Sequence, residues 1–268
     1  MVIVRLRINT SVLLKIKNVN MGTIKMTLRV GDGKNGNKAK LSGYLRSAGG
    51  YSVNWGDGNI ETVSRIHKRD LSCSLKLKHI YPIESITDDR TFEVTISTDR
   101  DNLYFFVADA GYMKIEAIDL SECQELETLR IWAMIESLDI TTNPNIKKIY
   151  ARSGSVKCLD FSKSSELEKL ELEGGEIQSL DLTHCVKLSS LNIEEIKELE
   201  KLDLSRCPRL SQIRLFKNPH LTDVFLHEKC RLVNFHLVGE FSEDTKDRIR
   251  AAWDNYKYTD LEMYYFRM

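Results

Sequence analysis

A short pattern that recurs through the middle of the chain constrains its fold more than any other feature. Each copy places two apolar residues around an aspartate and adds serine or threonine, as in Leu202-Asp203-Leu204-Ser205. A second apolar-x-apolar piece, such as Leu170-Glu171-Leu172, follows about 11 residues after the aspartate. The five aspartates are spaced by 20, 21, 21 and 22 residues and are Asp119, Asp139, Asp160, Asp181 and Asp203. A unit this short cannot bury its apolar face alone, so neighbouring copies must stack.

That period, combined with the L-x-x-L-x-L spacing inside it, is typical of a leucine-rich repeat solenoid. Successive side chains of a strand face opposite sides. The leucine and isoleucine columns should therefore point inward as the core, and the residues between them should point outward. We predict this solenoid over residues 111–240, which makes the protein mainly β.

Two outward columns change their residue type from copy to copy, whereas a position that only holds the coil would tend to repeat its residue. They contain aromatic and arginine side chains, which are favoured anchors at binding interfaces. We predict that these columns bind a ligand; the alternative is ordinary surface variation, with the aromatic rings covered by a loop or by the front domain. The predicted ligand-binding residues are Arg130, Trp132, Tyr150, Arg152, Glu171, Glu173, Asn192, Glu194, Arg214 and Phe216.

The aspartate column has a different interpretation. Adjacent strands of a sheet lie about 4.8 Å apart, so carboxylates stacked at that spacing repel unless they are solvated or hydrogen-bonded. A serine or threonine stands two residues after each aspartate, and its hydroxyl can donate to the carboxylate. We predict a solvated, hydrogen-bonded ladder without metal. The alternative is a row of calcium ligands, for which the candidates are Asp139, Asp160, Asp181 and Asp203.

A third column alternates between cysteine and small polar residues. Cys123, Cys185 and Cys207 occupy one slot of the repeat, which holds Asn143 and Ser164 in the other copies. No C-x-x-C pair is present, so we expect neither zinc nor any other cofactor. The predicted role is a buried ladder of small, weakly hydrogen-bonding side chains at the turn after each strand.

The segment from residue 23 to 110 alternates apolar and polar residues in short runs separated by glycine-rich turns, which predicts a β-sandwich. Gly31, Gly33 and Gly36 match a nucleotide-binding loop, but no helical pattern follows, so a hairpin loop is predicted. The run Val53-Asn54-Trp55-Gly56-Asp57-Gly58-Asn59, followed by His79-Ile80-Tyr81, resembles the PKD-like, immunoglobulin-like β-sandwich. Trp55 is expected to fill its core, Asp57 to cap the turn, and His79 to be a core or turn residue.

The repeats are similar to the bacterial leucine-rich repeats of about 21 residues in internalin-type adhesins, which share the L-D-L-S piece and the Asn/Cys slot. A PKD-like module followed by such repeats is a familiar combination in Bacteroides-like bacteria. The resemblance implies an extracytoplasmic or cell-surface adhesion protein with a protein or glycan ligand. The first twenty residues show no signal-peptide pattern, so a cytoplasmic location is the alternative.

The two ends of the chain complete the expected organisation. Residues 1–22 are strand-like and form an extension or an extra strand. Residues 241–268 are predicted to cap the solenoid, beginning with a helix whose N-cap is Ser242. Its apolar face would comprise Ile249, Ala252, Trp253 and Tyr256.

Composition and motifs limit the possible functions. The 39 basic and 39 acidic residues cancel, and no basic patch predicts a nucleic-acid partner. No apolar run is long enough for a transmembrane helix. Because catalytic motifs such as H-E-x-x-H, G-x-S-x-G and the P-loop are missing, we predict a non-enzymatic binding protein. We also predict that it is a monomer. The alternatives are an assembly subunit that self-associates through the same face, and a carbohydrate-active enzyme that would use carboxylates at 194–195 and 198–200.

Overall fold

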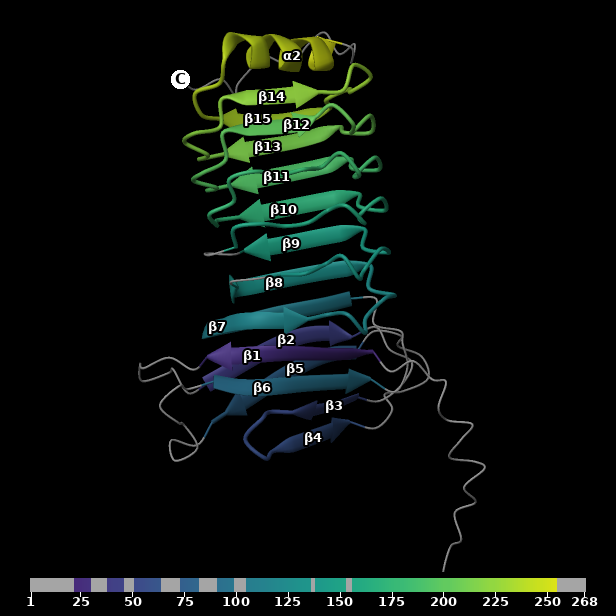
Figure 1. Ribbon diagram of the computed structural model, residues 1–268, viewed down its shortest axis with the longest axis vertical. Coiled ribbons are helices and arrows are strands. Elements are labelled where there is room, and N and C mark those ends of the chain that lie inside the picture. The colour runs from purple at the N-terminus through teal and green to yellow at the C-terminus, as the bar shows by residue number, and fades with distance from the viewer. Residues whose placement is uncertain are drawn as a thin grey trace, which may run out of the picture.

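The computed structural model is a long stack of β-strands with a helix at one end (Figure 1). The helix α2 closes one end of the stack, and strands β3 and β4 lie at the other. None of the helices in the described part of the chain is long and apolar enough to cross a bilayer. The structure describes residues 22–29, 38–45, 51–63, 73–81, 91–98, 105–135, 138–152 and 156–254.

Parallel strands, one from each turn, form the main sheet of the repeat region. Neighbours pair equivalent residues, as in Leu170↔Leu191, so the 20–22-residue period sets the register. The predicted leucine-rich repeat solenoid is therefore confirmed. These strands are β8 (Thr128–Ile135), β9 (Lys148–Arg152), β10 (Lys169–Glu173), β11 (Ser190–Glu194), β13 (Gln212–Phe216) and β15 (Asn234–Val238).

The interior of the solenoid is filled by the apolar columns that the repeat predicts. Leu129, Leu170 and Leu191 of successive strands are at most 1 % exposed. The apolar residues around the aspartate of each turn are mostly buried as well, but this piece forms paired strands only late in the stack, as β12 (Lys201–Leu204) and β14 (Asp223–Leu226). Full burial of one such side chain contributes roughly 1.5–3 kcal/mol, so the stack is held mainly by these columns.

The strands of the front region continue the sheet of the solenoid instead of forming a detached unit. Strand β7 pairs antiparallel with β1 and parallel with β8, which joins the two regions in one eleven-stranded sheet. Strand β7 therefore runs through the domain boundary that the sequence predicts at residue 110. The PKD-like sandwich itself stays a prediction. The front strands of this sheet are β1 (Thr23–Arg29), β3 (Tyr51–Asn54), β4 (Ile60–Val63), β6 (Thr91–Thr98) and β7 (Phe105–Asp119).

A separate antiparallel pair, β2 (Lys38–Leu45) and β5 (Cys73–Ile80), lies beside this sheet, with β2 close to β7. The loop with Gly31, Gly33 and Gly36 lies outside the described residues. So does the predicted extension over residues 1–22, apart from Gly22, whose carbonyl accepts a hydrogen bond from Thr98 N at 3.0 Å.

Aromatic packing surrounds the predicted Trp-Gly-Asp-Gly turn. Trp55 is fully buried and stacks on His79 with ring centroids 4.8 Å apart. The His79 Nε2 lies 2.7 Å from Asp57 Oδ2, while Asp57 Oδ1 accepts a hydrogen bond from Asn59 N at 3.0 Å. The Tyr81 hydroxyl donates to the Trp55 carbonyl at 3.0 Å. The predicted core role of Trp55 and capping role of Asp57 are confirmed.

The helix α2 (Glu243–Asp254) covers the last turn of the solenoid beside β14. Ser242 is its N-cap, because its Oγ accepts a hydrogen bond from Thr245 N at 3.3 Å. Ile249 and Ala252 are buried, and Trp253 packs edge-on against Phe235. The predicted start and buried face of the cap are therefore confirmed over the described residues, which exclude Tyr256 and the rest of the chain after it.

Candidate functional site

The ten predicted ligand-binding residues lie together as two adjacent columns on the outward side of strands β8 to β13. We call these ten residues the variable face. Register pairing places Arg130 beside Tyr150, and Trp132 beside Arg152. The same in-register pairing continues through β10, β11 and β13, and β15 adds His236 and Val238 to the two columns.

An arginine between two aromatic rings marks the end of the variable face nearest the front region. The Arg130 Cζ lies 5.1 Å from the ring centroid of Trp132 and 4.3 Å from that of Tyr150. Its Nε is buried without a hydrogen-bond partner among the described residues. Trp132 nevertheless remains 47 % exposed. A cation–π contact contributes about 0.5–1 kcal/mol, so the contact with Arg130 favours one orientation of the exposed indole.

A second aromatic–cation cluster lies toward the other end of the variable face. The ring of Phe216 has Arg214 Cζ at 5.3 Å and Lys217 Nζ at 5.0 Å from its centroid, and His236 at 5.9 Å between ring centroids. Strands β9, β10 and β11 separate this cluster from Trp132. At about 4.8 Å per strand, the two clusters are roughly 19 Å apart.

The charges between the two clusters are paired within the protein. Hydrogen bonding to Glu173 is the main cause that raises the pKa of Arg152. Exposed pairs of this kind contribute only about 0–1 kcal/mol to stability, so they mainly neutralise the centre of the face. Asn192 lies among them, with its Oδ1 buried and unpaired among the described residues. The pairs are Arg152 Nε–Glu173 at 2.7 Å, Lys169–Glu171 at 2.8 Å and Arg214–Glu194 at 3.5 Å.

Two lysines that take part in this arrangement were missed from the sequence. Lys169 Nζ lies 5.2 Å from the Tyr150 ring centroid, and Lys217 contacts the ring of Phe216. Both lysines lie next to the predicted columns. Lys217 directly follows Phe216, and Lys169 lies two residues before Glu171. Their position next to the columns was the only feature of the sequence that could have identified them as part of the site.

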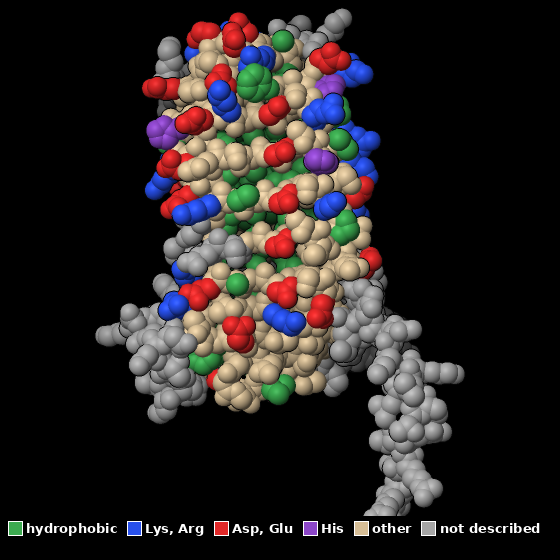
Figure 2. All heavy atoms as spheres, viewed as in Figure 1, with side chains coloured by type: hydrophobic (Ala, Val, Ile, Leu, Met, Phe, Trp, Pro, Cys, Tyr) green, Lys and Arg blue, Asp and Glu red, His purple; other side chains and the backbone are tan. Residues whose placement is uncertain are grey.

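The aspartate column is a ladder of local turns. In each of the five copies, the aspartate Oδ1 accepts a hydrogen bond from the backbone N–H two residues later, at 2.8–2.9 Å. Thr141 Oγ1 also donates to Asp139 at 2.7 Å. The carboxylates are hydrogen-bonded, as predicted, with the backbone N–H as the donor common to all five copies. No group of three or more His, Cys, Asp or Glu residues suited to a metal occurs in the described part of the chain. Figure 2 shows regularly spaced acidic side chains along the solenoid.

This ladder predicts a pH dependence of stability. The hydrogen bond from Ser162 N lowers the pKa of Asp160, and that from Thr183 N lowers the pKa of Asp181. A lowered folded-state pKa contributes stability above the unfolded value of about 3.9, which is lost as the pH falls through the folded value. We expect Asp160→Asn to have a lower urea midpoint than the wild type at pH 7. At about pH 2 the two midpoints should be equal. An equal difference at both pH values would contradict the assignment.

The cysteine slot is buried, as predicted. Cys207 and Cys230 direct their thiols at the carbonyls of Leu182 and Leu210, at 3.8 and 3.1 Å. Burial raises the pKa of Cys185 and Cys207 to about 12 and that of Cys230 to about 11. The thiols are therefore protonated at neutral pH, which suits structural rather than redox or metal-binding roles.

Thiol labelling should separate these cysteines from Cys158, which is exposed. We expect a thiolate-specific reagent at about pH 8 to modify Cys158 quickly and the buried thiols only after denaturation, because attack requires an accessible thiolate. Peptide mass spectrometry reports each site separately. Rapid labelling of Cys207 in the native protein, or an unreactive Cys158, would show that this assignment of exposure is wrong.

The fold defines a class, that of leucine-rich repeat β-solenoids closed by a C-terminal helix. No protein-family model matches the sequence, and no curated protein matches it. Among solved structures, the chain is similar to the functional domain of InlJ from Listeria monocytogenes, described as including a cysteine ladder. The identity is 18 %, the TM-score is 0.37, and the match covers 50 % of this chain and 32 % of that chain. The match thus spans about a third of the length of that chain.

Proposed function

We propose that this protein is a non-enzymatic, adhesion-type binding protein that presents the variable face to a protein or glycan ligand. The observation that carries the proposal is Trp132, which is 47 % exposed while Arg130, itself over the Tyr150 ring, contacts its indole. An exposed, pre-ordered tryptophan loses little conformational entropy on binding, and tryptophan, tyrosine and arginine are the commonest energetic anchors of interfaces.

The distribution of charge supports recognition by the two aromatic clusters. The variable face contains three arginines and three glutamates, so its net charge is zero, and Glu173 and Glu194 are already paired with Arg152 and Arg214. A partner therefore meets a neutral centre flanked by aromatic rings roughly 19 Å apart. A standard protein interface buries about 800 Å² on each partner, which is wide enough to cover both clusters.

The finer assignments rest on the sequence resemblance. In this proposal the front region is a PKD-like module that serves the solenoid as a cap and spacer. Trp55, Asp57, His79 and Tyr81 support this, because they pack around the turn in the roles that the resemblance implies. The same proposal makes the protein a monomer at a bacterial surface, as the resemblance implies.

A non-enzymatic role is supported by the carboxylates that a glycosidase would use. The general acid of such an enzyme needs a raised pKa. The ion pair with Lys217, whose Nζ lies 2.9 Å away, instead lowers the pKa of Glu195. A carboxylate held ionised in this way is unsuited to protonating a leaving group.

The test is binding by wild type and by Trp132→Ala across arrays of cell-surface proteins and glycans. We expect at least about thirtyfold weaker binding by the variant, the factor for a central anchor worth about 2 kcal/mol, with an unchanged melting temperature. The control is Val186→Ala, which removes an apolar side chain that is 45 % exposed away from the face. Ligand binding that persists in Trp132→Ala would overturn the proposed site.

The alternative role as an assembly subunit predicts a different result from the same residues. Sedimentation across a wide concentration range would show self-association of the wild type and its loss in the double variant Trp132→Ala, Tyr150→Ala. That outcome would identify the variable face as an oligomer interface. Monomers in both cases would leave the rings free for another ligand.

A further inference from the structure

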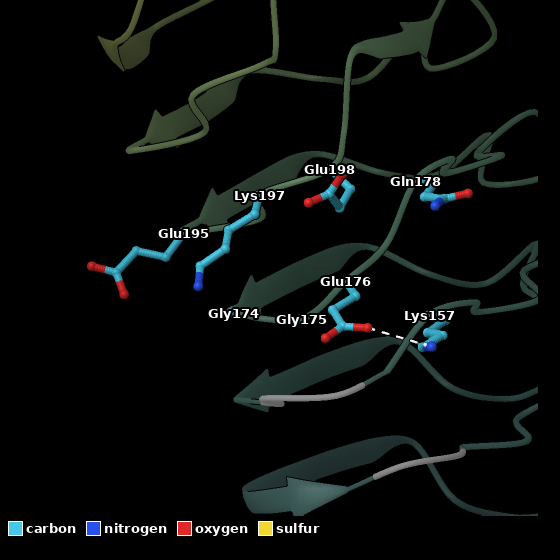
Figure 3. A pocket seen from close by; sticks show the side chains of 8 residues that line it. All are labelled: Lys157, Gly174, Gly175, Glu176, Gln178, Glu195, Lys197 and Glu198. Atoms are coloured by element: carbon cyan, nitrogen blue, oxygen red, sulfur yellow. Dashed lines mark ion pairs between the residues drawn. The ribbon is translucent and has the colours of Figure 1, made fainter.

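A depression of about 520 Å³ lies beside the loops that follow strands β10 and β11 (Figure 3). It is separate from the variable face, because none of the ten residues of that face lines it. Its volume falls within the roughly 300–1,000 Å³ typical of small-ligand sites. Three successive turns of the solenoid contribute to it, through Lys157, the loop at 174–178 and the loop at 195–198.

Two glycines leave the space open. Gly174 follows the end of β10 with φ 73°, and Gly175 follows it with φ 108°. The next two turns place Glu195 at φ 59° and Lys217 at φ 55° directly after their strands. The position directly after the strand therefore carries a side chain in two other turns. It does so although the left-handed conformation costs a non-glycine residue roughly 1–2 kcal/mol. The backbone of the two glycines forms a floor without side chains.

The charged groups at the two edges are already paired. Lys157 Nζ lies 3.5 Å from Glu176, and Lys217 Nζ lies 2.9 Å from Glu195. Figure 3 shows the first of these pairs at one edge of the depression, with Glu195 directed away at the other. Lys197, Glu198 and Gln178 are the remaining polar side chains of the lining.

The rest of the lining consists of exposed polar side chains. Lys197, Glu198 and Gln178 line the depression, and none of them forms an ion pair or side-chain hydrogen bond with the described residues. In Figure 3, Lys197 extends toward the Gly174 end of the floor, and Glu198 lies beside it. One ammonium, one carboxylate and one amide offer both donors and acceptors with no net charge.

We propose that this depression binds a sugar unit of a neutral glycan. Sugar hydroxyls both donate and accept hydrogen bonds, so they match Lys197, Glu198 and Gln178 without requiring a charge on the ligand. Because Gly174 and Gly175 carry no side chains, the C–H face of a sugar ring can approach their backbone closely. An anionic ligand would meet Glu198 unpaired, which makes it the poorer fit.

The experiment is calorimetric titration of the full chain with cellotetraose, maltotetraose and the N-acetylglucosamine tetramer, alongside the anionic tetragalacturonate. We expect at least one neutral tetrasaccharide to bind, and Lys197→Met and Glu198→Gln each to weaken it about tenfold, as for the loss of one charge-assisted hydrogen bond. The controls are Lys163→Met and Glu125→Gln, which change exposed residues outside the depression and should bind like the wild type.

Each other outcome overturns the proposal. If no neutral tetrasaccharide binds, or if the depression and control variants weaken binding equally, the depression is not a sugar site. If only tetragalacturonate binds, and Glu198→Gln strengthens it, the depression is an anion site. Trp132→Ala should leave sugar binding intact, so a failure here is distinguishable from a failure of the variable face.

Discussion

Replacing Gly56 by alanine should lower the free energy of unfolding by about 3 kcal/mol or more. Gly56 follows β3 and Trp55 with φ 81°, a conformation that L-residues rarely adopt. An added Cβ would lie 2.7 Å from the Glu93 carbonyl oxygen and 3.0 Å from its nitrogen. Both atoms belong to the backbone of β6, which cannot rotate away. Relief requires β3 and β6 to move apart, and that breaks their pairing at Asn54↔Thr95.

Gly58→Ala provides the matched control. Gly58 has φ 91°, but nothing lies within 4 Å of the position of its added Cβ. The substitution therefore meets only the backbone strain of a left-handed residue, about 1–2 kcal/mol. Urea unfolding followed by circular dichroism and by tryptophan fluorescence measures both variants. Equal losses would mean that β6 yields to the added methyl group and that the close approach is unimportant for stability.

The repeat region could be predicted well from sequence because its contacts are between equivalent residues. Once the spacing of Asp139, Asp160 and Asp181 is known, the partner of every strand residue lies 20–22 positions away. The pairing Glu171↔Asn192, and with it the outward columns, then follows from the alternation of a strand. The front region has no such rule. The pairing Ile24↔Ile96 joins residues 72 positions apart, and no local pattern encodes it.

The features that the sequence did not predict are those that no repeated or local pattern encodes. Strand β4 was not recognised from the sequence, because its four residues carry too little periodicity. The sheet continues from the front region into the solenoid through β7, a connection that depends on long-range pairing. Within the variable face, alternation placed Arg152 and Glu173 outward but did not reveal that they bind each other.

The depression at Gly174 and Gly175 was also missed, although the sequence contained a usable signal. The slot after the strand holds Glu195 and Lys217 in the next two copies, whereas this copy has two adjacent glycines. A loss of side chains in one copy of a repeat opens space between its neighbours. Comparing the copies for missing volume, as well as for variable residue type, would have found it.

Asn218, two residues after β13, should be among the most sensitive positions of the solenoid, and we expect Asn218→Ala to lower the free energy of unfolding by about 3 kcal/mol. Asn218 is 2 % exposed. Its Oδ1 accepts a hydrogen bond from Ile196 N at 2.9 Å, and its Nδ2 donates to the Ile193 carbonyl at 3.0 Å. Alanine removes both bonds and leaves the buried Ile196 N–H without an acceptor, which alone costs about 1–3 kcal/mol.

Asn145→Ala tests whether burial, and not the amide itself, sets this cost. Asn145 donates from Nδ2 to the Gln124 carbonyl at 3.1 Å, also between successive turns, but it is exposed. Water replaces the lost partner there, so the change should stay within about 0.5 kcal/mol. Urea midpoints compare the two variants, and amide hydrogen exchange at Ile196 reports the local effect. A loss for Asn218→Ala no greater than for Asn145→Ala would mean that water enters the turn and that this side chain does not join the turns of the solenoid. A large loss with fast exchange at Ile196 would identify the buried amide as the link that fixes one turn of the stack on the next.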